Sequence, residues 1–161
     1  MKKVLFLLIT LAGMVWLPAC GTQPDWENKF YSVEERAVTA FLEYEITAAR
    51  ACRSYRGTAA QPGHQLVVAE VSIWNTEEYT LPMGRYDFRV QWGEREEDYA
   101  YPLAWYCDAQ LPDQYDIPED GQVRGVLVFE IPEGDRELAL GFLEVFENES
   151  QGDAHFIYFT I

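Results

Sequence analysis

Apolar and polar residues alternate over most of the chain beyond residue 60, which is the pattern of half-buried β-strands. Leu66 to Trp74 and Tyr86 to Trp92 each place apolar side chains at every second position. Val123 to Ile131 is almost continuously apolar, as expected of a central buried strand. Leu138 to Phe146 and His155 to Ile161 are two further predicted strands. Short strands separated by turn-forming residues predict an all-β sandwich or barrel.

The residues that these strands turn to one face form the predicted core. They are Val71, Ile73, Val90, Leu127, Phe129, Leu140 and Phe146. Trp74 and Trp92 also fall in strand patterns and are expected to be packed. The chain has 161 residues, which predicts one domain with a hydrophobic core of ordinary size.

The segment from Ser32 to Ala51 fits two patterns. Ser32 and Glu35 have the spacing of a capping box, and apolar residues after them could line one face of a helix. From Val38 to Ala48, however, apolar residues also occupy every second position. The alternation favours strands, and a packed helix is the alternative.

The longest segment without a strand pattern runs from Gly93 to Gln122 and is rich in tyrosine and tryptophan. Loops of this length in a compact domain often carry function. The candidate binding residues are Tyr101, Trp105, Tyr106, Asp108 and Asp113. An equally supported interpretation is that these aromatic side chains fold back and cover an open end of the sandwich.

The N-terminus has the pattern of an export signal. Lys2 and Lys3 precede an apolar run of 14 residues, Val4 to Leu17, which is shorter than the roughly 20 residues of a membrane-spanning helix. Leu17 to Gly21 (LPACG) resembles the lipobox of bacterial lipoproteins, although proline is unusual before the small residue. The resemblance implies that Cys20 receives a lipid and becomes the first residue of the mature chain.

The expected organisation is a lipoprotein signal peptide at 1–19, a lipid-anchored tether at 20–31 and a β-sandwich at 32–161. The expected location is the extracytoplasmic face of the cell membrane, with the N-terminal lipid as the contact to the bilayer. An ordinary secretory signal with an incidental cysteine is the alternative.

Once Cys20 is lipidated, Cys52 and Cys107 remain as an even pair in an oxidising compartment, which predicts a disulfide between them. Two free thiols are the alternative, and thiol titration of unfolded, unreduced protein distinguishes the two.

The charge of the chain is strongly acidic. There are 27 acidic and 12 basic residues, a net charge of −15, and loss of Lys2 and Lys3 with the signal would leave −17. A nucleic-acid-binding protein needs a basic surface to displace phosphate counterions, so nucleic acid is not an expected partner. The charge is expected to serve solubility, with an acidic patch for a cationic ligand as the alternative.

Signatures of catalysis and of metal binding are weak. His64 and His155 do not have zinc-ligand spacing, and no nucleophile, phosphate-loop or dinucleotide motif occurs. The acidic runs are expected to be solvated turn residues. A calcium site is a minor alternative, with the candidate ligands Asp113, Asp116, Glu119 and Asp120. No cofactor, no metal and no enzymatic activity are expected.

Two stretches point to a known family. Leu66 to Thr76 (LVVAEVSIWNT) and Asp120 to Pro132 (DGQVRGVLVFEIP) resemble the two signatures of a bacterial immunoglobulin-like lipoprotein domain of unknown function, the 4352 family. That family is similar to mycobacterial immunoprotective secreted antigens. The resemblance implies an immunoglobulin-like antiparallel β-sandwich of about seven strands and no known activity. Gly125 would let the chain turn or bulge into a strand and Phe129 would fill the core, so no functional residue is carried over.

The function that these observations favour is a non-enzymatic binding or protein-interaction domain, anchored outside the membrane. The partner classes are a cell-surface protein or a glycan. A carbohydrate-binding or accessory module of a surface complex is an alternative, and a hydrolase on a β-sandwich scaffold is a less favoured one.

Overall fold

The structure is a computed structural model that describes residues 27–161 apart from positions 94, 96 and 135–136. The predicted signal peptide, the predicted lipidation residue Cys20 and positions 21–26 of the predicted tether lie outside the described residues.

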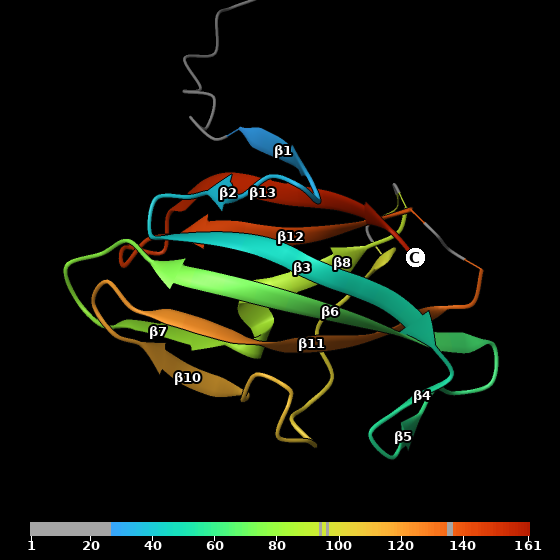
Figure 1. Cartoon of the computed structure of the whole chain (residues 1–161). Helices are drawn as coiled ribbons and strands as arrows, with labels where there is room; N and C mark the ends of the chain where they lie inside the picture. Colours follow the sequence, from blue (N-terminus) through green and yellow to red (C-terminus); the bar gives the residue numbers. More distant parts are fainter. Residues whose placement is uncertain (1–26, 94, 96, 135–136) are drawn as a thin grey trace, which may run out of the picture.

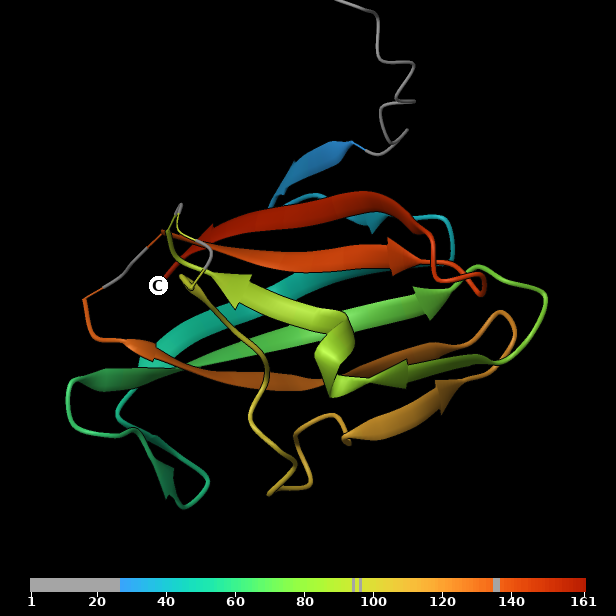
Figure 2. The same cartoon turned by 180° about the vertical axis from the view of Figure 1, so that it is seen from behind.

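Two β-sheets pack face to face and enclose the core (Figures 1 and 2). The four-stranded sheet has the order β11 (Gln122–Pro132), β6 (His64–Asn75), β3 (Leu42–Cys52) and β2 (Ala37–Val38). The five-stranded sheet has the order β1 (Asn28–Ser32), β13 (Gln151–Thr160), β12 (Glu137–Val145), β8 (Phe88–Gln91) and β9 (Tyr99–Ala100). The predicted β-sandwich is confirmed.

Two small strand pairs complete the described structure. They are β7 (Leu81–Gly84) with β10 (Gln114–Ile117), and β4 (Ser54–Tyr55) with β5 (Thr58–Ala59). A 3₁₀ turn, Arg85–Asp87, links β7 to β8. Pairing is antiparallel with one exception among the named strands: β1 runs parallel to β13, from Asn28 opposite Ala154 to Ser32 opposite Tyr158.

The core lies between the two sheets and follows the alternation in the strands. Six of the seven predicted core residues are buried, and Phe129, Ile73 and Val90 are fully enclosed. Phe146 was predicted as core and this was wrong, because it follows the end of β12 and is 39% exposed. Its ring packs edge-on against Phe41, with 5.1 Å between ring centroids.

The segment from Ser32 to Ala51 forms strands, which confirms the favoured prediction over the helix. Its capping-box residues make a turn instead. The Ser32 N–H donates to the Glu35 carboxylate at 2.7 Å, and the Glu35 N–H donates to the Ser32 carbonyl at 3.0 Å. These are local hydrogen bonds that fit a turn before β2 as well as a helix start.

Three predicted boundaries need correction. The sandwich begins at β1, so residues 28–31 belong to a sheet and not to the tether. Tyr86 was predicted to begin a strand, but it lies in the 3₁₀ turn and is exposed. The segment from Gly93 to Gln122 is not strand-free, because it contains β9 and β10.

The two signature stretches form β6 and β11, which are paired from Gln122–Trp74 to Pro132–His64. The buried Asn75 amide at the end of β6 contacts the carbonyls of Tyr79, Ile117 and Pro118. It therefore ties three chain segments together at one end of the sandwich.

Gly125 serves close packing, not a bulge. It lies within the regular β6–β11 pairing, and a Cβ added there would lie 2.5 Å from Leu111 Cδ2. The glycine lets the segment around Leu111 lie directly on β11.

Candidate functional site

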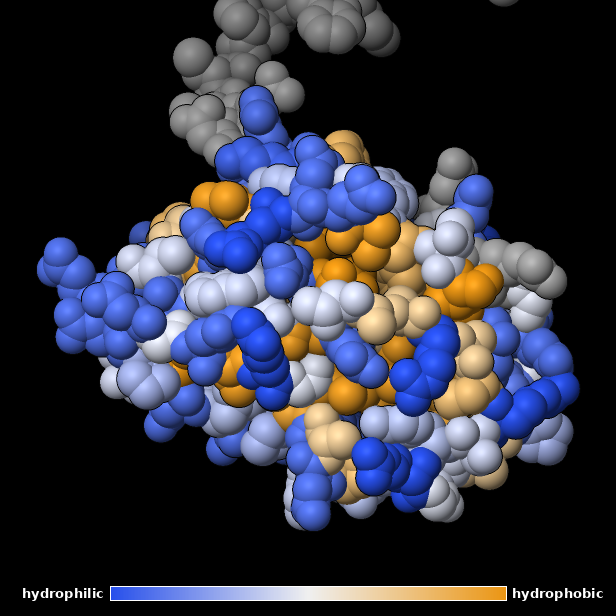
Figure 3. All heavy atoms as spheres, in the orientation of Figure 1, coloured by the Kyte–Doolittle hydropathy of each residue, from blue (hydrophilic) through white to orange (hydrophobic). Residues whose placement is uncertain are grey.

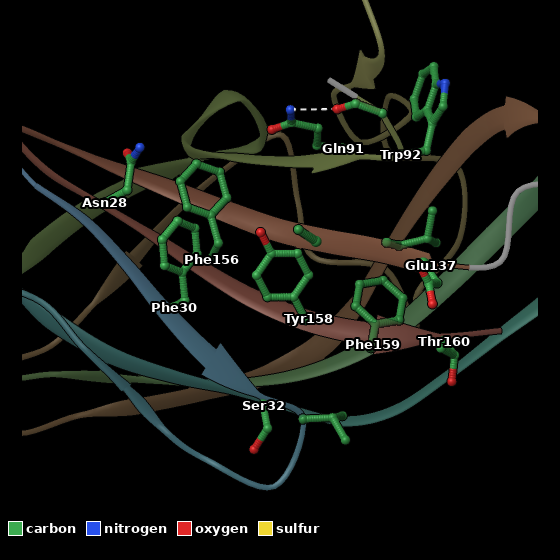
Figure 4. A pocket seen from close by; sticks show the side chains of 14 residues that line it. Asn28, Phe30, Ser32, Gln91, Trp92, Glu137, Phe156, Tyr158, Phe159 and Thr160 are labelled. Carbon is green, nitrogen blue, oxygen red and sulfur yellow. Dashed lines mark hydrogen bonds between the residues drawn. The ribbon is translucent and has the colours of Figure 1, made fainter. Parts of the chain in front are cut away.

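An aromatic groove of about 790 Å³ runs over the outer face of the five-stranded sheet (Figure 4). We call it the aromatic groove and define it by Phe30 of β1, Phe156 and Tyr158 of β13, Ala139 of β12 and Gln91 of β8. Alternation places these side chains on the outer face, because the residues between them, such as Tyr31 and Ile157, pack toward the core.

Three aromatic rings lie side by side in the groove. The Phe30 and Phe156 centroids are 5.8 Å apart with 25° between ring planes, and Phe30 and Tyr158 are also 5.8 Å apart at 34°. Phe30 is 59% exposed and Tyr158 is 53% exposed. Exposed aromatic side chains on a regular sheet form a preorganised contact surface.

Gly141 of β12 lies opposite Phe156 and lets the Phe156 ring approach the sheet. A Cβ at position 141 would lie 2.9 Å from Phe156 Cε1, closer than van der Waals contact allows. Ala139 lies two residues earlier on the same face. Because both residues are small, the aromatic rings project above this part of the sheet.

The described polar groups around the rings are almost all neutral. They come from Asn28, Ser32, Gln91 and Thr160, and Glu137 contributes a carboxylate. The Gln91 amide nitrogen donates to the Gly93 carbonyl at 2.8 Å (Figure 4). Such a surface can offer ring faces together with hydrogen-bond donors and acceptors.

The binding residues predicted from the sequence do not converge on one site. Tyr101 is 39% exposed and contacts Tyr86 and Tyr99 edge-on, both at 83° between ring planes. Trp105 is 50% exposed and lies with Asp108 beside a shallow hollow of about 550 Å³.

The other two predicted residues act within the protein. The Asp113 carboxylate accepts the Trp105 N–H at 2.9 Å, and so holds the backbone at Trp105. The Tyr106 hydroxyl is buried, and burial raises its pKa, with a smaller contribution from the Cys107 thiol.

Part of the long segment packs on the outer face of the four-stranded sheet, through Leu103 and Ala109 and not through the aromatic side chains that were expected to cover an open end of the sandwich. The Leu103 N–H donates to the Val128 carbonyl at 2.7 Å, and the Leu111 N–H to the Val126 carbonyl at 3.0 Å. Leu103 and Ala109 pack on outward-facing apolar residues of β6 and β11. Apolar side chains also show in the middle of this face, between polar ones (Figure 3). The segment thus protects the β11 edge while Trp105 stays exposed.

Cys52 and Cys107 are free, half-buried thiols in the structure. Both contribute to the raised pKa of Tyr106, after burial, which places them near the same side chain. Their disulfide stays a prediction.

A buried polar network lies beneath the edge of the five-stranded sheet, and we call it the His155 network. His155 is fully buried, and its Nε2 lies 3.0 Å from the Glu144 carboxylate, which is itself buried. Its Nδ1 lies 3.2 Å from the Tyr31 hydroxyl of β1. The Glu144 carboxylate also accepts the N–H groups of Ala40 at 2.7 Å and Asp153 at 2.9 Å. The network therefore joins β1, β12, β13 and the turn before β3.

A substrate has little access to the His155 network, because its two central side chains are buried. Glu144, Asp153 and His155 could each direct one ligand atom toward a metal ion, within 4.8 Å of one another. Protein donors already occupy those oxygens, since Asp153 also pairs with the Lys29 ammonium at 2.5 Å and accepts the Glu27 N–H at 2.8 Å. The arrangement fits a structural clamp better than a metal centre.

Acidic pH is expected to weaken the attachment of β1 to β13. The hydrogen bond from Lys29, and then that from the Glu27 N–H, lower the pKa of Asp153 below its ordinary value of 3.8. A carboxyl group whose pKa is lower in the folded than in the unfolded state stabilises the fold at pH values above its unfolded pKa. This stabilisation is lost as the pH falls through the folded pKa. We therefore expect amide-exchange protection of residues 28–32 to fall below about pH 4.

The Asp153→Asn variant should show the reduced protection at neutral pH and little further change in acid. Asp116→Asn, an exposed aspartate on β10, is the matched control. Equal protection of residues 28–32 in wild type and Asp153→Asn at neutral pH would contradict the assignment.

Sequence reasoning missed the groove because its residues were assigned elsewhere. Phe30 fell in the predicted tether. Phe156 and Tyr158 fell in a predicted strand for which only the core-facing residues were considered. The signal was present in that strand, where Phe156 and Tyr158 alternate with the buried Ile157 and Phe159. An outward face with two aromatic residues is unusual enough to mark a site.

The fold and the groove define a two-sheet β-sandwich with an exposed aromatic surface. The model of a domain of unknown function, DUF4352, matches residues 31–151, and the chain belongs to this family. The family resemblance drawn from the two signature strands is confirmed. Comparison with curated protein sequences gives no match.

Solved structures with the same fold come from several bacteria. The putative lipoprotein ycdA of Bacillus subtilis has a TM-score of 0.58 and 15% identity over 78% of this chain, which spans only 38% of ycdA. An uncharacterized β-sandwich protein of Clostridium difficile 630 has a TM-score of 0.51 and 12% identity, covering 86% of this chain and 98% of its own. The secreted protein MPT63 of Mycobacterium tuberculosis has a TM-score of 0.52 and 9% identity, covering 84% of this chain and 98% of its own. At these identities the likeness shows the fold alone.

Within the described ranges, no helix has the length and apolar character needed to span a membrane.

Proposed function

We propose that the chain is an extracytoplasmic, lipid-anchored binding protein that uses the aromatic groove as its ligand surface and catalyses no reaction. The observation that carries the proposal is the set of three neighbouring aromatic rings, two of them more than half exposed, on the outer face of a paired sheet. Leaving such side chains in water costs free energy that a partner can recover on binding.

The anchor is supported by the lipobox-like sequence around Cys20. Six residues lie between Cys20 and Glu27, which makes seven steps along the chain, and an extended chain spans at most about 3.6 Å per step, so the tether would reach roughly 25 Å. The groove would then lie close to the outer surface of the bilayer, because β1 follows the tether directly and carries Phe30.

A hydrolase is less well supported. Among the described residues that line the groove, Glu137 is the one carboxylate, whereas glycoside hydrolysis needs a pair. The Glu144–His155 pair has acid–base chemistry, but both side chains are buried away from a substrate.

The anchor is tested by intact-mass analysis of the membrane fraction. The expected species begins at an acylated Cys20, and Cys20→Ser should release the protein from membranes. A mature protein that is soluble and unacylated would contradict the anchor while leaving the groove proposal untouched.

The groove is tested by sedimentation of the purified protein with isolated cell envelopes. The double variant Phe30→Ala with Tyr158→Ala should keep its fold, because both side chains are exposed, and should lose envelope binding. Tyr86→Ala with Trp105→Ala removes two equally exposed aromatic residues elsewhere and is the matched control. Loss of binding in the control alone would move the site to Tyr86 or to the Trp105 hollow, which the two single variants then separate.

A further inference from the structure

We infer that the occupant of the aromatic groove is a neutral polysaccharide chain, whose sugar rings stack on Phe30, Phe156 and Tyr158. This inference rests on the proposed binding function and names its ligand class. Four features of the groove support it: the ring geometry, the polar surroundings, the charge and the size.

The ring geometry suits a flat ligand. The planes of Phe30, Phe156 and Tyr158 differ by 25° and 34° between neighbours, so the rings form a shallow platform. A cage for a quaternary ammonium ion surrounds the cation with several ring faces, which this platform does not provide. The Tyr101 ring lies at 83° to both the Tyr86 and the Tyr99 ring, so these three rings have no common plane. The apolar face of a pyranose ring can lie on the platform.

Gly141 supports the platform from below. The Cδ1–Cε1 edge of the Phe156 ring lies closer to position 141 than a Cβ there would allow, so the glycine fixes where the ring sits beside Phe30.

The polar groups suit the hydroxyl groups of a sugar. Asn28 and Gln91 offer amides, Ser32 and Thr160 offer hydroxyls, and Glu137 offers a carboxylate. Each of these groups can exchange hydrogen bonds with a sugar hydroxyl at the edge of a stacked ring. A lipid tail would leave them unpaired, which is costly once water is excluded.

The charge disfavours an anionic ligand. The chain has a net charge of −15, and the described lining of the groove contains a carboxylate. Arg89 lies beside Gly141 on the same face, but its guanidinium lies over the Tyr99 ring, 5.4 Å from the ring centroid. A negatively charged polymer or an anionic bilayer would be repelled by this field. A neutral glycan pays no such cost. The groove volume of about 790 Å³ lies within the roughly 300–1,000 Å³ of typical ligand sites, which suits a short run of sugars.

Isothermal titration calorimetry of the purified protein with three neutral hexasaccharides, cellohexaose, chitohexaose and maltohexaose, tests the inference. At least one should bind. Phe30→Ala and Tyr158→Ala should each weaken that binding by roughly tenfold, as expected for an aromatic contact worth about 1.4 kcal/mol. Tyr158→Phe should retain most of the affinity, because the ring face is kept. Trp105→Ala should bind as the wild type does.

Gly141→Ala offers an independent test of the platform, because the added methyl group should tilt Phe156 and weaken binding without removing an aromatic ring. Its unfolding free energy is measured alongside, and Leu143→Ala, at an exposed residue of the same strand outside the groove lining, is the control. Wild-type affinity in a folded Gly141→Ala would overturn the platform argument.

The outcomes separate this inference from the proposed function. If no hexasaccharide binds while envelope binding still depends on Phe30 and Tyr158, the glycan inference is overturned and the groove remains the site. Groove-dependent binding of tetramethylammonium or of phosphatidylglycerol vesicles, without hexasaccharide binding, would also overturn it. If envelope binding is indifferent to both residues, the proposed function itself fails.

Discussion

Replacing Glu144 with alanine is expected to cost about 3–5 kcal/mol of unfolding free energy, because it breaks a buried, fully hydrogen-bonded pair. Its carboxylate accepts hydrogen bonds from the Ala40 and Asp153 N–H groups and from the His155 ring. Alanine would leave three buried or part-buried donors without an acceptor, and each unsatisfied group costs about 1–3 kcal/mol. Urea unfolding of the purified protein measures the loss.

Two controls define the cause. Glu70→Ala removes a half-exposed glutamate of β6 that forms a long ion pair with Arg50 at 3.6 Å, and should change stability by less than about 0.5 kcal/mol. Glu144→Gln keeps one carbonyl acceptor and should lose less than Glu144→Ala. A loss at Glu144→Ala no larger than that at Glu70→Ala would refute the clamp role of the His155 network.

The His155 network connects β1 to the core and to the four-stranded sheet. Tyr31 projects from β1 onto His155, and the Tyr44 hydroxyl donates to the His155 carbonyl at 2.9 Å from the four-stranded sheet. Burial raises the pKa of Tyr44, so this hydroxyl stays protonated as a donor.

Local alternation was sufficient to predict the sandwich because the central strands are long and bury one face. In β6 and β11, Val71, Ile73, Leu127 and Phe129 face the core as the pattern indicated. The ends of strands were less predictable. Phe146 continues the alternation of β12, but the strand ends at Val145 and the side chain turns to the surface.

The site could not be predicted because it depends on pairing between distant segments. β1 joins β13 across more than 120 residues of sequence, and only this pairing brings Phe30 next to Phe156. The same holds for Tyr31 and His155, which no sequence spacing relates. The aromatic content led to the prediction of a binding site in the segment 93–122. Part of this segment instead covers a sheet, while Trp105 remains exposed.

Phe129→Ala and Phe146→Ala form a matched pair that tests the corrected core directly. Both residues fit the apolar pattern, but Phe129 is fully buried between the sheets, whereas Phe146 is 39% exposed and makes an edge-on contact with Phe41. Emptying the Phe129 site should leave a cavity and cost about 3–5 kcal/mol. Truncating Phe146 loses mainly one aromatic pair and should cost about 1 kcal/mol.

The comparison is read from urea unfolding midpoints at an unchanged slope, which ensures that the same amount of surface unfolds in each variant. Because the two substitutions remove the same atoms, the difference between their losses reports burial and not chemistry. Comparable losses would show that Phe146 packs as a core residue and that the end of β12 lies further along the chain. A difference of at least about 2 kcal/mol supports the structure, since a surface phenylalanine has no cavity to leave behind.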